Sequence, residues 1–244
     1  MNRLLSLTAV LFFYLSASLS AQNFLVVDQN AWPGKLISIR GSNTTHVWQR
    51  GPVNDRLVAK IQSLTSQNDG SIAFVSGLDR SIITLGPGGE GELHQGGYLA
   101  RQVRTDENGD LYWSGLETPQ NDNPLPDGFI YRRRAVDGQV ETVLTFSQSL
   151  VERDWWGAFD VRGGQIFVAT AKTPAKIYRL ENSIPTLIAT VPFPISSIRF
   201  ESNNSILAAD GRGRIYRVAD LQQPQQAEVV VQREFPIVDF LRVP

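Results

Sequence analysis

The sequence of 244 residues contains no cysteine and has two histidines, His46 and His94. The absence of cysteine excludes disulfides, thiolate-bound zinc and cysteine nucleophiles, so the fold must be held together by its core. There is also no excess of one charge, because 23 basic and 24 acidic side chains give a formal net charge of −1. A nucleic-acid partner needs a strongly basic surface. We therefore expect no nucleic-acid partner.

Long apolar runs are also scarce. After the first 20 residues, no stretch approaches the roughly 20 apolar residues that a membrane span needs. The apolar run 4–19 follows Arg3 and ends at the small residues Ser20 and Ala21. This order is typical of a secretory signal peptide, and a membrane anchor is the alternative interpretation. We predict a signal peptide over residues 1–21 and a secreted or periplasmic mature chain over 22–244, with no membrane contact after cleavage.

The sequence is instead rich in short apolar segments that repeat. Segments that align with KIYRL (Lys176–Leu180) recur five times, at intervals of 46, 48, 47 and 38 residues. A second apolar segment precedes each of them, often just after a turn pair such as Asp69-Gly70 or Gly163-Gly164. Short apolar runs bounded by Gly and Asn predict β-strands joined by hairpins. A period of 40 to 50 residues predicts a β-propeller.

The two ends of the repeat are incomplete in complementary ways. Phe193–Phe200 (FPISSIRF) matches Phe235–Val243 (FPIVDFLRV), but no further strand follows the second copy. The first apolar segment of the mature chain, Phe24–Asp28, already aligns with the second strands of the repeat. We therefore predict an all-β, five-bladed β-propeller in one domain, whose ring is closed when Phe235–Val243 pairs within the N-terminal blade. This pairing would remove an open strand edge.

Two segments, Phe24–Ile39 and Ser205–Val218, resemble the signature of NHL-repeat propellers and their gluconolactonase-like and streptogramin-lyase-like relatives. The shared pattern is an apolar strand that ends in Asp (Asp28 and Asp210), a short loop, and an apolar strand with a basic residue near its start. The resemblance implies the propeller architecture, and hydrolase or lyase activity in the central channel is the function that it suggests.

Asp28 and Asp210 could form a catalytic carboxylate pair. The stronger interpretation is structural, because an Asp at the end of a strand accepts backbone N–H bonds and sets the turn that follows.

The inner strands of a propeller begin at one end of its central channel, together with the loops between second and third strands. Aligning the inner strands places Gln62 and Arg101 in one column near this end, and Gln102 and Asp239 in the next. Asp239 is the one acidic residue in these columns, and Arg101 would oppose a cation. The columns therefore indicate no metal site, and no other cofactor is evident; a divalent cation such as calcium stays the alternative.

Extra loop length and aromatic side chains gather at the same end. The loops 117–127 and 147–154 are longer than the repeat requires, and such loops often carry function. We expect them to lie side by side, with the principal ligand pocket next to them. Trp32 and Trp155 would offer flat apolar surfaces to a sugar ring or a similar ligand, and packing within a blade is the alternative. Arg101 would be available to an anionic or hydroxylated group.

These features favour a monomeric, non-catalytic binding module for a small molecule, a carbohydrate or a protein. The ligand-binding candidates are Trp32, Gln62, Arg101, Gln102 and Trp155. One alternative is a gluconolactonase-like hydrolase or streptogramin-lyase-like lyase, with Asp154, Asp239 and His94 as catalytic candidates. A structural scaffold that uses its outer blade edges as an interaction surface is a further alternative.

Overall fold

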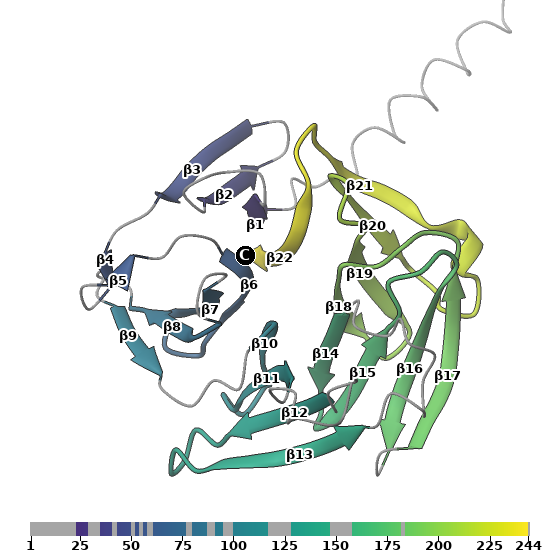
Figure 1. Ribbon diagram of the computed structural model, residues 1–244. Coiled ribbons are helices and arrows are strands. Elements are labelled where there is room, and N and C mark those ends of the chain that lie inside the picture. The colour runs from purple at the N-terminus through teal and green to yellow at the C-terminus, as the bar shows by residue number, and fades with distance from the viewer. Residues whose placement is uncertain are drawn as a thin grey trace, which may run out of the picture.

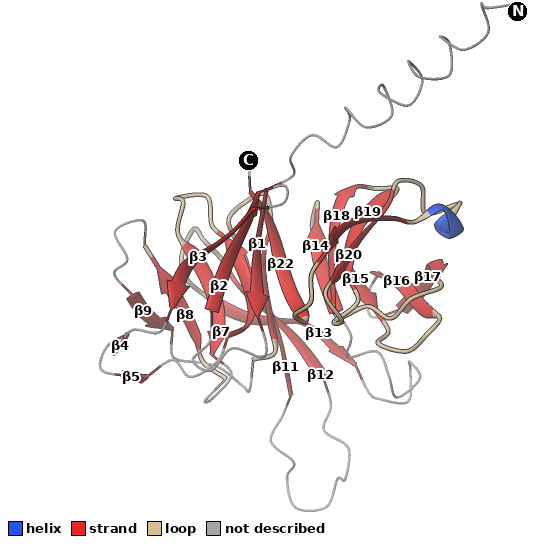
Figure 2. Ribbon diagram, turned by 90° about the horizontal axis from the view of Figure 1, so that it is seen from above, coloured by secondary structure: helices blue, strands red, loops and turns tan. Residues whose placement is uncertain are grey.

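The computed structural model describes residues 23–28, 35–40, 43–49, 52–53, 56–57, 61–76, 80–86, 91–94, 100–116, 128–146, 158–181 and 184–243. These residues form five four-stranded antiparallel sheets in a ring, so the predicted all-β, five-bladed propeller is confirmed (Figures 1 and 2). None of them forms a helix long and apolar enough to cross a membrane. The predicted signal peptide lies outside the described residues.

Each blade runs from an inner strand beside the central axis to an outer strand at the rim (Figure 1). In this order, blade 1 contains β22 (Ile237–Val243), β1 (Asn23–Asp28), β2 (Lys35–Arg40) and β3 (Asn43–Gln49), and blade 2 contains β6 (Ile61–Ser66), β7 (Ile72–Ser76), β8 (Ile82–Leu85) and β9 (Gly91–His94). Blade 3 contains β10 (Gln102–Thr105), β11 (Leu111–Leu116), β12 (Gly128–Arg133) and β13 (Val140–Phe146).

The last two blades complete the ring. Blade 4 contains β14 (Ala158–Arg162), β15 (Gln165–Ala169), β16 (Ala175–Glu181) and β17 (Ile184–Val191), and blade 5 contains β18 (Ser197–Ser202), β19 (Ser205–Ala209), β20 (Arg214–Val218) and β21 (Glu228–Gln232). Outside the blades, a small sheet pairs β4 (Pro52–Val53) with β5 (Arg56–Leu57), and η1 (Pro224–Gln226) is a short 3-10 helix.

The ring closes as predicted, through β22. This strand pairs antiparallel with β1, so that Leu25 lies opposite Leu241 and Val26 lies opposite Phe240. Figure 1 shows the yellow C-terminal strand beside the purple β1. The rings of Phe24 and Phe240 meet edge to face, with centroids 6.0 Å apart. The N-terminal blade therefore owes its inner strand to the far end of the sequence.

The core lies between the blades, and each strand contributes to two parts of it. On β1, Phe24 and Val26 pack into the cluster between blades 5 and 1, with Leu207. The alternate residue Leu25 packs into the cluster between blades 1 and 2, with Phe74. Since successive side chains of a strand point to opposite faces, both faces of the blade are buried and both must be apolar. This explains the near-continuous apolar runs of the sequence.

The turn after β19 bears out the structural interpretation of Asp210. Its Oδ1 accepts hydrogen bonds from the backbone N–H groups of Arg212 (2.7 Å) and Arg214 (3.1 Å). Gly211 and Gly213 follow in the left-handed region, with φ of 72° and 100°. Asp210 thus sets a turn. The side chain of Asp28 lies outside the described residues.

We predict that Gly213→Ala destabilises the protein strongly. A Cβ atom at this position would lie 2.3 Å from the Arg233 carbonyl oxygen and 2.8 Å from that of Phe235. Both are backbone atoms, so the strand connection would have to shift, at a cost of about 3 kcal/mol of unfolding free energy. Gly164→Ala is the control, because its φ is 72° but nothing lies within 4 Å. Urea denaturation that gives equal losses for both variants would contradict this packing.

A second prediction concerns ring closure. Deletion of residues 235–244 removes β22, opens the edge of β1 and uncovers the apolar cluster between blades 5 and 1. We expect the truncated chain to lose its cooperative thermal transition, or to melt far below the full chain. Deletion of Pro244 alone is the control. If the chain without β22 melts at the same temperature as the control, ring closure does not support the fold.

Candidate functional site

The five inner strands turn unpaired edges toward the central axis. Each is the edge of a sheet, so the N–H and C=O groups on its axis side have no neighbouring strand to pair with. Side chains of the adjacent inner strand supply acceptors instead. Within the described residues, inner-strand N–H groups donate to the side chains of Ser63 (from Val103, 3.1 Å), Thr65 (from Thr105, 3.1 Å), Gln102 (from Phe159, 2.9 Å), Asp160 (from Phe200, 2.7 Å) and Asp239 (from Leu64, 3.0 Å).

An ion pair that is closed to solvent lies at the axis. The side chains of Arg104 and Asp239 are both 0% exposed, and Nη1 of Arg104 lies 3.0 Å from Oδ2 of Asp239. Arg104 also donates from Nη1 to the Val103 carbonyl (2.7 Å) and from Nε to the Phe159 carbonyl (2.9 Å). The guanidinium therefore neutralises the carboxylate and satisfies backbone acceptors at the same time.

Asp239 has little capacity left for a ligand. Besides Arg104, its two oxygens accept hydrogen bonds from the hydroxyls of Ser63 and Ser197 and from the N–H groups of Leu64 (3.0 Å) and Phe240 (2.9 Å). Burial acts to raise the pKa of Asp239, but the guanidinium groups of Arg104 and Arg199 outweigh it and hold the pKa below its ordinary value. Asp239 is thus a saturated, ionised structural carboxylate.

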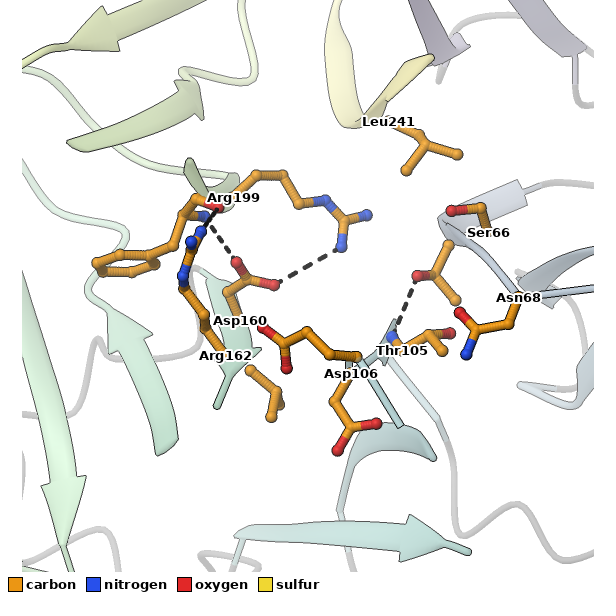
Figure 3. A pocket seen from close by; sticks show the side chains of 12 residues that line it. Ser66, Asn68, Thr105, Asp106, Asp160, Arg162, Arg199 and Leu241 are labelled. Atoms are coloured by element: carbon orange, nitrogen blue, oxygen red, sulfur yellow. Dashed lines mark hydrogen bonds and ion pairs between the residues drawn. The ribbon is translucent and has the colours of Figure 1, made fainter. Parts of the chain in front are cut away.

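A second, looser pair lies beside the first. Arg199 Nη1 lies 3.9 Å from Asp160 Oδ1 (Figure 3). Arg199 also donates to the carbonyls of Leu64 (2.5 Å) and Phe240 (3.1 Å). Burial and the adjacent Arg104 lower the pKa of Arg199 to about 10, so it stays protonated at neutral pH. Burial raises the pKa of Asp160. The network of Arg104, Asp160, Arg199 and Asp239 therefore carries no net charge when all four groups are ionised.

Arg80 and Arg101 both lie at the end of the axis where the inner strands begin. We call this end the start end. Arg80, between β7 and β8, donates to Oε1 of Gln62, and its carbonyl accepts from Ala100 N (3.2 Å), next to Arg101. Burial, and in second place repulsion by the positive charge of Arg80, lower the pKa of Arg101. Arg80 has φ of 59°, a backbone conformation that costs a non-glycine residue about 1 kcal/mol and is common at functional sites.

The structure brings some of the predicted site residues together and separates others. Gln62 and Arg101 share the start end with Arg80, which the sequence did not single out. Gln102 lies deeper, where its Nε2 donates to the Ser196 carbonyl (2.9 Å). His94 ends β9, the outermost strand of blade 2, and its side chain lies outside the described residues. Also outside them are Trp32, Asp154 and Trp155 and the loops 117–127 and 147–154.

The described residues do not fit a divalent cation. In this part of the chain no three His, Asp or Glu side chains come together to hold a metal. Hard cations need several free oxygen ligands. The one acidic residue of the predicted columns, Asp239, has its oxygens engaged by five donors and lies beside two guanidinium groups.

Comparison with known proteins shows a likeness of fold. No family model matches the chain, and no curated protein matches its sequence. Among solved structures, a chain of a nidogen/laminin complex superposes with a TM-score of 0.54 at 12% identity, over 88% of this chain and 80% of that one. A gluconolactonase from Xanthomonas campestris superposes with a TM-score of 0.53 at 12% identity, over 91% of this chain and 85% of that one. The resemblance to gluconolactonase-like propellers is thus confirmed as one of architecture.

The network of Arg104, Asp160, Arg199 and Asp239 leads to a prediction about the stability of the fold. Asp239→Ala removes the closest counter-ion of the buried Arg104 and leaves only the looser contact with Asp160 (3.7 Å), so we expect the free energy of unfolding to fall by about 3–5 kcal/mol. The double variant Arg104→Met with Asp239→Leu should lose less than the sum of its single variants, because neither charge is left alone. Asp137→Ala, which breaks an exposed pair with Arg134, is the control and should cost about 0–1 kcal/mol.

The pH dependence of the free energy of unfolding tests whether Asp239 is ionised in the folded protein. Since the folded pKa of Asp239 lies below its ordinary value of 3.8, its contribution is complete above that pH and is lost as pH falls through the folded pKa. The stability difference between wild type and Asp239→Asn, measured by urea denaturation, should therefore narrow below about pH 4. A difference that stays constant down to pH 2.5 would show that the carboxylate charge does not matter.

Proposed function

We propose that this chain is an exported, monomeric, non-catalytic binding module whose start end holds a small anionic or hydroxylated molecule. The observation that carries the proposal is the placement of Arg80, which donates to Gln62, at the same end of the axis as Arg101, whose neighbour Ala100 donates to the Arg80 carbonyl. Export is supported by the signal-peptide pattern of residues 1–21. The likeness to a gluconolactonase supports the propeller frame and leaves its function open.

The chemistry of the start end favours an anion or a hydroxyl-rich molecule. Two guanidinium groups at the same end create a local positive potential, and their planar forks match carboxylate and phosphate oxygens. The Gln62 amide adds a polar group that can accept from or donate to a hydroxyl. Repulsion by Arg80 also acts to lower the pKa of Arg101, and an anion bound near both groups would act in the opposite direction. Trp32 and Trp155 are proposed to add apolar surface.

Binding is favoured over hydrolysis because the carboxylate of Asp239 is already bound by other groups of the protein. A hydrolase that used Asp239 as a base or as a cation ligand would have to break its contacts with Arg104, Ser63 and Ser197. These contacts are buried, and an unpaired Arg104 would be costly. The alternative, a gluconolactonase-like hydrolase that acts in the channel, would then depend on Asp154, because His94 ends the outermost strand of blade 2.

The experiment is a ligand screen followed by variants. We expect sugar acids, other carboxylates or inorganic phosphate to raise the melting temperature of the wild type. Affinity, measured by calorimetry, should fall about tenfold in Arg101→Gln and in Arg80→Gln, because each removes a charged hydrogen-bond donor. Arg134→Gln is the matched control, since Arg134 lies on the exposed hairpin between β12 and β13.

Two outcomes would overturn the proposal. One is a bound anion whose affinity is the same in wild type, Arg80→Gln and Arg101→Gln. The other is hydrolysis of a sugar lactone by the wild type, with or without added divalent cation, that disappears in Asp154→Asn while the fold is unchanged; this would favour the hydrolase.

A further inference from the structure

A cavity of about 290 Å³ lies at the other end of the axis, which we call the hairpin end (Figure 3). Here the inner strands turn back into the second strands, for example at the hairpin between β10 and β11. The cavity is independent of the start end, because the buried network of Arg104 and Asp239 lies between them. The predicted ligand-binding residues that the structure describes, Gln62, Arg101 and Gln102, do not line it.

The wall of the cavity has a neutral side and a charged side. Blade 2 and the end of β10 contribute hydroxyl and amide side chains, namely Thr65, Ser66, Asn68 and Thr105. Blades 4 and 5 contribute Asp160, Arg162 and Arg199, and the hairpin between β10 and β11 contributes Glu107. Apolar surface comes from three further residues, Val161, Phe200 and Leu241. Figure 3 shows Leu241, Ser66 and Thr105 on the side away from Asp160 and Arg162.

Several charged groups keep capacity for a ligand. Asp160 Oδ1 lies 3.7 Å from Arg104 Nε and 3.9 Å from Arg199 Nη1, distances that are longer than a hydrogen bond. Glu107 is exposed and accepts from Gly163 N through Oε2 (3.0 Å), and a carboxylate has further lone pairs. Arg162 donates from Nη1 to the Phe200 carbonyl (3.0 Å), and a guanidinium has five donors in all.

One acidic residue of the wall, Asp106, has a structural role. Asp106 accepts from the N–H groups of Asn108 and Asp110 (both 2.9 Å) and from the Tyr112 hydroxyl (3.3 Å), so it sets the hairpin between β10 and β11. It still contributes negative charge to the wall.

The mixed signs of the wall charges disfavour a simple anion and a simple cation. An anion would meet Asp106, Glu107 and Asp160, whereas a cation would meet Arg162 and Arg199. A neutral ligand with many hydroxyl groups avoids both penalties, because each hydroxyl can donate to a carboxylate and accept from a guanidinium or an amide. The size sets a second limit, since about 290 Å³ is at the small end of ligand pockets. A single sugar ring fits this volume, and the C–H groups of a ring suit the apolar side chains.

We propose that the cavity at the hairpin end binds a neutral monosaccharide. Asp160 and Glu107 accept from its hydroxyls, Arg162 donates to them, and Phe200 and Leu241 contact the ring. This site does not depend on the anion site proposed at the start end.

The test is a panel of neutral monosaccharides, including glucose, galactose, mannose and N-acetylglucosamine, against the full chain. Binding is detected by ligand-observed NMR and quantified by calorimetry. We expect at least one sugar to bind, and Glu107→Gln and Arg162→Gln each to weaken it about tenfold through loss of a charged hydrogen bond. Melting temperatures establish that each variant is folded.

Matched controls separate this cavity from the rest of the surface. Glu141→Gln and Arg134→Gln make the same replacements on the exposed outer part of blade 3 and should leave sugar affinity unchanged. Arg101→Gln should also leave it unchanged, so a failure of the start-end site does not affect this result. The proposal is overturned if no sugar of the panel binds, if binding ignores Glu107→Gln and Arg162→Gln, or if a sugar acid or an amino sugar displaces the neutral sugar with higher affinity.

Discussion

The free edges of the inner strands are the constraint on which this propeller depends. Five sheets end at the axis, and no strand remains to pair with the N–H and C=O groups that face it. The protein meets this requirement with side chains from the adjacent blade, such as Gln102, which accepts from the Phe159 N–H. Because each bond joins two blades, the hydrogen-bonding requirement and the relative placement of the blades are solved by the same contacts.

The buried charges follow from the same requirement. Carbonyl groups at the axis need donors, and arginine is the side chain with the most donors in a fixed geometry. Arg104 and Arg199 serve the carbonyls of Phe159, Leu64 and Phe240, and their charge then has to be neutralised. Asp160 and Asp239 do this while they also accept from backbone N–H groups. The ion pairs are therefore better understood as one polar network than as independent salt bridges, because the removal of a single member leaves its partners buried and unsatisfied.

Much of the architecture could be predicted from sequence because the repeat is periodic and both faces of each blade are apolar. Even the closing strand was predictable, since FPIVDFLRV copies FPISSIRF. The column that contains Gln102 and Asp239 was found, but Arg104, Asp160 and Arg199 were not. They lie two residues further along the inner strands on the same face, and a lone charge in a strand looks like a solvent-exposed residue. The place of Arg80 at the start end could not be predicted, because no sequence pattern indicates that a non-glycine residue adopts a φ of 59°.

The pairing of β22 with β1 also orders the events of folding. These two strands come from opposite ends of the described chain, so their contact has the greatest possible sequence separation and a high closure entropy. During synthesis, β1, β2 and β3 emerge before the strands of the other four blades, yet their blade lacks its inner strand until β22 has been made. Blades 2 to 5 can each form from contiguous sequence. Blade 1, whose outer three strands precede all the other blades in the sequence, is therefore the last blade to be completed, and until then β1 presents an open strand edge to other chains.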